Sequence, residues 1–211
     1  MFIELVDALR CPNAHDESWL VAAARRMEAR HIVEGTLGCP VCAAEYPIHH
    51  GVADFRRAPA PVAAARTDPG SDPDAAARLA AFLDLTDASG FAVLLGEWGV
   101  HATAVETLTQ TPLLLVNPPA EIEGSPGISV LRCDDVLPLA AAASRGTALD
   151  DASPVLVHAA VRATRAGGRV AASVAVPVPD GVRELVRDEA WWVGEREQAP
   201  LPLLSLHVRR R

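Results

Sequence analysis

The 211-residue sequence predicts an α/β protein, a doubly wound and largely parallel sheet preceded by a small α+β module. Residues 74–211 alternate helical patterns with short apolar runs that end in glycine, asparagine or aspartate. Residues 1–56 differ, because they contain three of the four cysteines. Between these segments, residues 57–73 are rich in proline and alanine, which is typical of a linker. We therefore expect a module over 1–56, a linker over 57–73 and an α/β domain over 74–211.

In the module, the pattern predicts one helix followed by extended segments. Residues 17–30 place apolar side chains on one helical face and charged ones opposite. Residues 31–40 alternate sides as a strand does. Residues 45–55 form a second extended segment, with His50 and Gly51 as its turn. The module should therefore be α+β.

In the α/β domain, apolar strands and amphipathic helices follow one another. Glycines after an apolar helical run indicate a helix end, and proline suits a first helical turn. The expected elements are a helix from about 74, a strand in 91–99, a helix near 100–109, strands in 112–117 and 127–135, a helix over 153–168 stopped by Gly167-Gly168, a strand over 169–179, a helix over 181–192 and a last strand over 202–208.

The charge pattern argues against a general nucleic-acid binder. The formal net charge is −8, and all 19 basic residues are arginines. Binding to phosphate backbones needs clustered cations. No apolar run reaches the ~20 residues that cross a bilayer, and no signal-peptide pattern opens the chain. We expect a cytoplasmic protein that contacts neither membrane nor nucleic acid.

The cysteines of the module indicate a metal site. Zinc needs about four nitrogen or sulfur ligands, usually two from each of two tight turns. Cys39-Pro-Val-Cys42 supplies one such turn, and Cys11 is a third candidate. His15, four residues after Cys11, is the fourth. The expected ligands are therefore Cys11, His15, Cys39 and Cys42.

Other interpretations of this pattern remain open. A second Cys-x-x-Cys pair beginning at Cys11 would have its other cysteine at position 14, where the sequence has Ala14. The metal could therefore have been lost and replaced by apolar packing. His49 or His50 could supply the fourth ligand instead of His15. A thioredoxin-type redox role fits less well, because the pair precedes a strand-like run and does not open a helix.

The stretches LVDALRCP and GTLGCPVCAAEYPIHHGVADF resemble a small zinc-ribbon family. This family includes the activator subunit of tRNA and translation-factor methyltransferases and its short bacterial relatives. The resemblance covers roughly residues 3–55, with Tyr46-Pro47-Ile48 and Gly51 at the expected places and a departure at Ala14. It implies a module that pairs with a methyltransferase domain by strand addition and apolar contact, without catalysis of its own.

Residues 75–200 resemble a class I, S-adenosylmethionine-dependent methyltransferase domain. The resemblance rests on the order of the strand ends and on the segment Ala163–Arg169. It implies three cofactor anchors: the turn from Gly96 to Gly99, Asn117 for the ribose, and Asp134 or Asp135 for the adenine. Trp98 lies inside the turn, and an amide replaces the usual carboxylate at Asn117.

Functional positions are thus replaced at Ala14, Trp98 and Asn117, while the core pattern is kept. We expect a methyltransferase-like protein without catalytic residues, acting as a structural or protein-interaction component. Its partner would be a protein, either a second copy or a methyltransferase. The alternative is an active S-adenosylmethionine-dependent methyltransferase with an atypical cofactor loop. The cofactors to test are zinc and S-adenosylmethionine.

Overall fold

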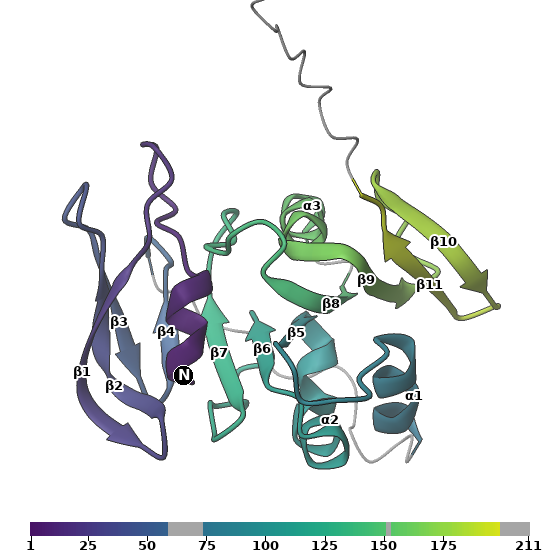
Figure 1. Ribbon diagram of the computed structural model, residues 1–211, viewed down its shortest axis with the longest axis horizontal. Coiled ribbons are helices and arrows are strands. Elements are labelled where there is room, and N and C mark those ends of the chain that lie inside the picture. Colours follow the sequence, from purple (N-terminus) through teal and green to yellow (C-terminus); the bar gives the residue numbers. More distant parts are fainter. Residues whose placement is uncertain (59–73, 151–152, 199–211) are drawn as a thin grey trace, which may run out of the picture.

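The computed structural model describes residues 1–58, 74–150 and 153–198, which form one mixed sheet with helices on both faces (Figure 1). The strands are β1 (Val21–Glu28), β2 (His31–Gly38), β3 (Glu45–His49), β4 (Val52–Asp54), β5 (Ala92–Leu95), β6 (Leu113–Val116), β7 (Ile128–Arg132), β8 (Ser144–Leu149), β9 (Thr164–Ser173), β10 (Val182–Arg187) and β11 (Trp191–Arg196). The helices are η1 (Ile3–Ala8) and η2 (Gly96–His101), both 3-10, and α1 (Ala75–Phe82), α2 (Ala102–Thr109) and α3 (Pro154–Ala163).

The 11 strands follow the order β1-β2-β3-β4-β7-β6-β5-β8-β9-β11-β10. From β4 to β9 all neighbours are parallel, which confirms the predicted parallel core. The carboxyl ends of these strands therefore meet at one edge of the sheet. The chain order reverses between β5 and β8, and in open α/β sheets ligands bind at such a switch point.

Alternate residues of the central strands face two separate cores. Leu94 belongs to the core that contains Leu79 of α1 and Val105 of α2. Leu95 belongs to the other core, which contains Leu156 of α3 and Leu5 of η1. Among the described residues, no helix is long and apolar enough to cross a membrane.

The N-terminal module extends this same sheet. Its last strand, β4, pairs in parallel with β7, so that Ala53 lies opposite Leu131 and Asp54 opposite Arg132. The buried side chain of Ile48 in β3 belongs to the same core as Leu131. The module is therefore built into the α/β core by strand pairing and apolar contact.

The predicted helix over 17–30 is wrong, because this segment forms β1 and pairs with β2. The two strands are joined by a two-residue turn in which Ala29 and Arg30 have positive φ values of 44° and 66°. This geometry matches the right-handed twist of a hairpin, although the turn contains no glycine or asparagine. The module is thus β-rich, with only the 3-10 turn η1 as helix.

The predicted helix over 181–192 is also wrong, because β10 and β11 form a hairpin there. The carboxylate of Asp188 accepts hydrogen bonds from the amides of Ala190 and Trp191, each at 2.7 Å, and so shapes the turn. Trp192 is fully buried, and its indole donates to the carbonyl of Val176. Tertiary burial of this tryptophan outweighs the helical pattern.

Two further expectations need correction. Helix α3 ends at Ala163, and Gly167-Gly168 lie within β9. Strand β8 was not predicted, because its buried positions include the polar Ser144 and Thr147. The expected strand over 202–208 lies outside the described residues, as does the part of the linker over 59–73.

We expect the chain to unfold in one transition, because one of the two cores contains buried residues of both the module and the α/β domain. The Ile48→Ala variant should lower the free energy of unfolding by about 2–5 kcal/mol, as other large-to-small core substitutions do. The Val21→Ala variant, at a side chain 61% exposed, should change it by less than about 0.5 kcal/mol. Denaturant unfolding followed by tryptophan fluorescence and far-UV circular dichroism tests this. Two transitions, of which Ile48→Ala shifts only one, would contradict a shared core.

Candidate functional site

Four cysteine and histidine side chains of the module converge at one point. The loop after η1 supplies Cys11 and His15, and the tight turn after β2 supplies Cys39 and Cys42. Their ligand atoms all lie within 4.8 Å of one another. We call this group the Cys/His cluster; it could bind a metal such as zinc.

The distances within the Cys/His cluster fit a tetrahedral zinc ion. With Zn–S near 2.3 Å and Zn–N near 2.0 Å, tetrahedral geometry separates two sulfurs by about 3.8 Å and a sulfur from a nitrogen by about 3.5 Å. The Sγ atoms of Cys11 and Cys42 are 3.7 Å apart, and Sγ of Cys39 is 3.4 Å from Nε2 of His15. The sulfur separation is far longer than a disulfide bond of about 2.0 Å. All four cysteines of the chain are free thiols.

Outer contacts orient the ligands. Nδ1 of His15 donates to the carbonyl of Asp16 at 2.6 Å, which leaves the lone pair of Nε2 toward the sulfurs. The side-chain amide of Asn13 donates to Sγ of Cys42 at 3.3 Å. This bond, followed by that from the backbone amide of Ala44, lowers the pKa of Cys42 to about 6 and favours the metal-binding thiolate.

The structure selects His15 over the other candidate histidines. Nδ1 of His49 pairs with Glu34 at 3.0 Å, on the exposed surface of β2 and β3. The loop delivers a nitrogen ligand one residue after Ala14, so the alanine does not leave the cluster short of a fourth ligand. Only the spacing from Cys11 to His15 departs from the usual pattern.

At the switch point, the turn after β5 is filled by the chain itself. Gly96 adopts a positive φ of 53°, and Asp150 follows β8 beside it. A Cβ placed on Gly96 would lie 1.7 Å from Oδ2 of Asp150. This oxygen also accepts a hydrogen bond from the amide of Glu97 at 2.9 Å. The indole N–H of Trp98 donates a hydrogen bond to the carbonyl of Leu149 at 2.8 Å. This bond links the turn after β5 to the end of β8.

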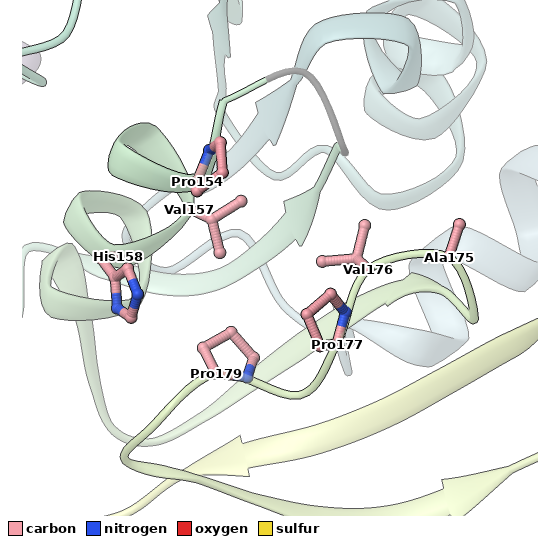
Figure 2. A pocket seen from close by; sticks show the side chains of 7 residues that line it. All are labelled: Pro154, Val157, His158, Ala175, Val176, Pro177 and Pro179. Carbon is pink, nitrogen blue, oxygen red and sulfur yellow. The ribbon is translucent and has the colours of Figure 1, made fainter.

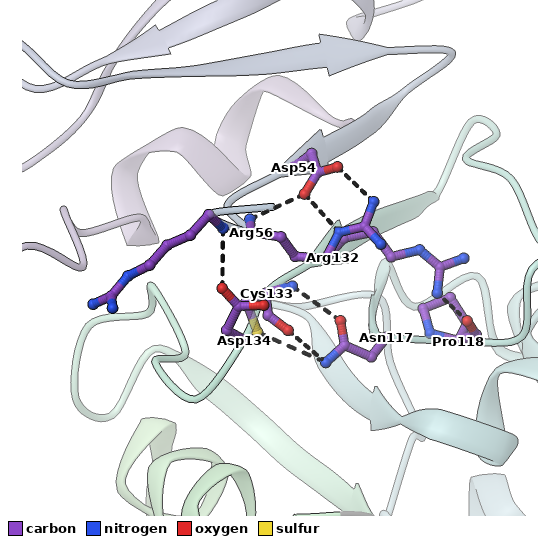
Figure 3. Close-up of polar contacts among 8 residues, drawn as sticks. Asp54, Arg56, Asn117, Pro118, Arg132, Cys133 and Asp134 are labelled. Carbon is purple, nitrogen blue, oxygen red and sulfur yellow. Dashed lines mark hydrogen bonds and ion pairs between the residues drawn. The ribbon is translucent and has the colours of Figure 1, made fainter. Parts of the chain in front are cut away.

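The other two predicted anchors also form intrachain bonds (Figure 3). The amide group of Asn117 donates to the carbonyl of Cys133 and accepts from its N–H, both at 2.9 Å. The carboxylate of Asp134 accepts from the backbone amide of Arg57 at 3.0 Å. Asp135 is exposed beside it. Gly96, Asn117 and Asp134 thus all lie at the carboxyl edge, and all contact other parts of this chain.

A cavity of about 690 Å³ lies between the module and this edge. We call it the seam cavity. Asn117, Asp134 and Asp135 line it from the α/β side, and Asn13 and Arg56 are among the residues that line it from the module. Sequence reasoning missed this cavity, because it exists only where β4 places the module beside β7.

A second, smaller pocket of about 160 Å³ lies between α3 and the loop after β9 (Figure 2). Prolines and small apolar side chains line it, and its one titratable side chain is the exposed imidazole of His158. Nothing in this lining resembles a catalytic arrangement. Another histidine, His101, contacts the ring of Trp98.

No protein-family profile matches this chain, and no curated protein matches it. The family resemblance of the two segments therefore rests on the residues quoted for it in the sequence.

We expect the variants Cys39→Ser and His15→Ala to lose metal affinity by more than 100-fold, since each removes a ligand. Asn13→Ala removes only an outer hydrogen bond and should cost about 10- to 100-fold. Competition between the protein and a chelator for zinc measures these affinities. His49→Ala is the matched control, and an equal loss in this variant would contradict the assignment of His15.

Proposed function

We propose that this chain is a methyltransferase-like protein that does not catalyse methyl transfer and that acts as a structural or protein-interaction component. The parallel order β7-β6-β5-β8-β9, with its switch point between β5 and β8, agrees with the doubly wound sheet expected for such a domain. The addition of β4 to β7 agrees with an activator-type module that joins a methyltransferase-like sheet.

The observation that carries this proposal is the carboxylate of Asp150 inside the Gly96 turn. Cofactor binding at such a turn needs close approach to the backbone, and that space is filled here by Oδ2 of Asp150. The amide of Glu97 is already bonded to the same oxygen. A cofactor would have to displace a charge-assisted hydrogen bond, which is stronger than a neutral one.

We further propose that the Cys/His cluster binds zinc in a structural role. Four protein ligands complete a tetrahedron and leave no open position for a substrate or an activated water. Structural zinc sites contribute directly to folding free energy. The metal would therefore stabilise the module against the α/β sheet and would take no part in a reaction.

The second candidate function is an active S-adenosylmethionine-dependent methyltransferase. The seam cavity favours it, because Asn117 and Asp134 line a space large enough for a small ligand. The two candidates differ in whether the free protein binds the methyl donor.

We expect isothermal titration of the wild-type protein with S-adenosylmethionine to give no binding heat and no thermal shift. An established methyltransferase titrated with the same solution controls for the ligand. Micromolar binding that disappears in Asp134→Ala would overturn the proposal in favour of the active enzyme. Circular dichroism should show that the variant is folded.

A further inference from the structure

The seam cavity is formed jointly by the two parts of the chain. Its volume of about 690 Å³ falls within the range of ligand sites, roughly 300–1,000 Å³. Apolar surface comes from both parts, with Phe55 and Tyr46 on the module side and Leu156 of α3 on the other. The rings of Phe55 and Tyr46 stack at 4.5 Å and are largely buried, so this wall is rigid.

Several polar groups of the cavity are already paired within the chain. Arg56 donates to both carboxylate oxygens of Asp54, the shorter contact being 2.6 Å (Figure 3). Asn117 and one oxygen of Asp134 are held by the backbone contacts described above. These groups shape the cavity and are not free to bind a ligand strongly.

Three charged side chains of the lining form no hydrogen bond or ion pair within the part of the chain that the structure describes. These are the carboxylates of Glu45 and Asp135 and the guanidinium of Arg57. All three line the cavity and are exposed. Over the whole lining, four carboxylates face two guanidinium groups, so the cavity is net negative. The net charge of −8 has the same sign and would attract a cationic partner from a distance.

We propose that the seam cavity binds a basic segment of a partner protein, with an arginine or lysine side chain between Glu45 and Asp135. This inference rests on the proposed interaction function and names the chemistry of the partner. The aliphatic stem of such a side chain would pack on Phe55 and Tyr46, while the cation stays near the carboxylates. The cavity is larger than one side chain requires, so part of the peptide backbone enters with it.

The test is titration of the full chain with a fluorescent oligo-arginine peptide. Asp135→Asn and Glu45→Gln should each raise the Kd about 2- to 5-fold, as expected for partly exposed charge pairs. Arg57→Gln should lower the Kd by a similar factor, because it removes a repelling cation. Binding should weaken with added salt, since the charges are screened.

A higher Kd in the two acidic-residue variants together with a lower Kd in the Arg57 variant supports the proposal. Substitutions that only perturb folding would not raise the Kd in one case and lower it in the other. Three results would each overturn the proposal. The first is an equal Kd in all variants, and the second is tighter binding of an oligo-glutamate peptide than of the oligo-arginine peptide. The third is that the single amino-acid derivative argininamide binds as tightly as the oligo-arginine peptide. Titration of the same samples with S-adenosylmethionine separates the two claims. Methyl-donor binding contradicts the proposed function, whereas absent peptide binding contradicts only the present inference.

Discussion

The parallel pairing of β4 with β7 determines how the module meets the α/β domain. Because β4 runs in the direction of β7, the chain leaves it at the carboxyl edge of the sheet, beside the ends of β6 and β7. Arg56 and Arg57 are carried to that edge, where the backbone amide of Arg57 donates a hydrogen bond to the carboxylate of Asp134. Arg132, opposite Asp54 in the pair, is buried and donates to the carbonyls of Pro118 and Pro119. The module and the α/β domain consequently share one core and one cavity.

The Cys/His cluster and the carboxyl edge are linked through this geometry. Asn13 bonds Cys42 and also lines the seam cavity, and Tyr46 contacts Sγ of Cys11 on one side and the cavity on the other. A metal in the cluster would therefore fix one wall of the cavity. The opposite wall carries the side chains that the methyltransferase resemblance assigns to a cofactor. These side chains form hydrogen bonds within the chain. This arrangement is the basis of our proposal that the edge serves as a surface for a partner.

The sequence predicts those features that depend on short-range patterns. The continuous apolar runs of β5 and β6 can be recognised in the sequence because both faces of these strands are buried. The pair Cys39-x-x-Cys42 predicts a metal-binding turn from spacing alone. Strand β8 could not be found, because its buried Thr147 has partners that only the fold brings close, above all Thr164, whose hydroxyl lies 2.7 Å away. The seam cavity also escapes prediction, since it joins residues 77 positions apart.

At the carboxyl edge, the groups that the methyltransferase resemblance assigns to a cofactor are held by hydrogen bonds within the chain. Three backbone amides donate to side chains there, those of Glu97, Cys133 and Arg57. Amide hydrogen exchange by NMR, with and without excess S-adenosylmethionine, tests the claim directly. We expect all three amides to be protected in the free protein, and we expect the ligand to leave their exchange unchanged. Rapid exchange in the free protein, with protection only after the ligand is added, would contradict it.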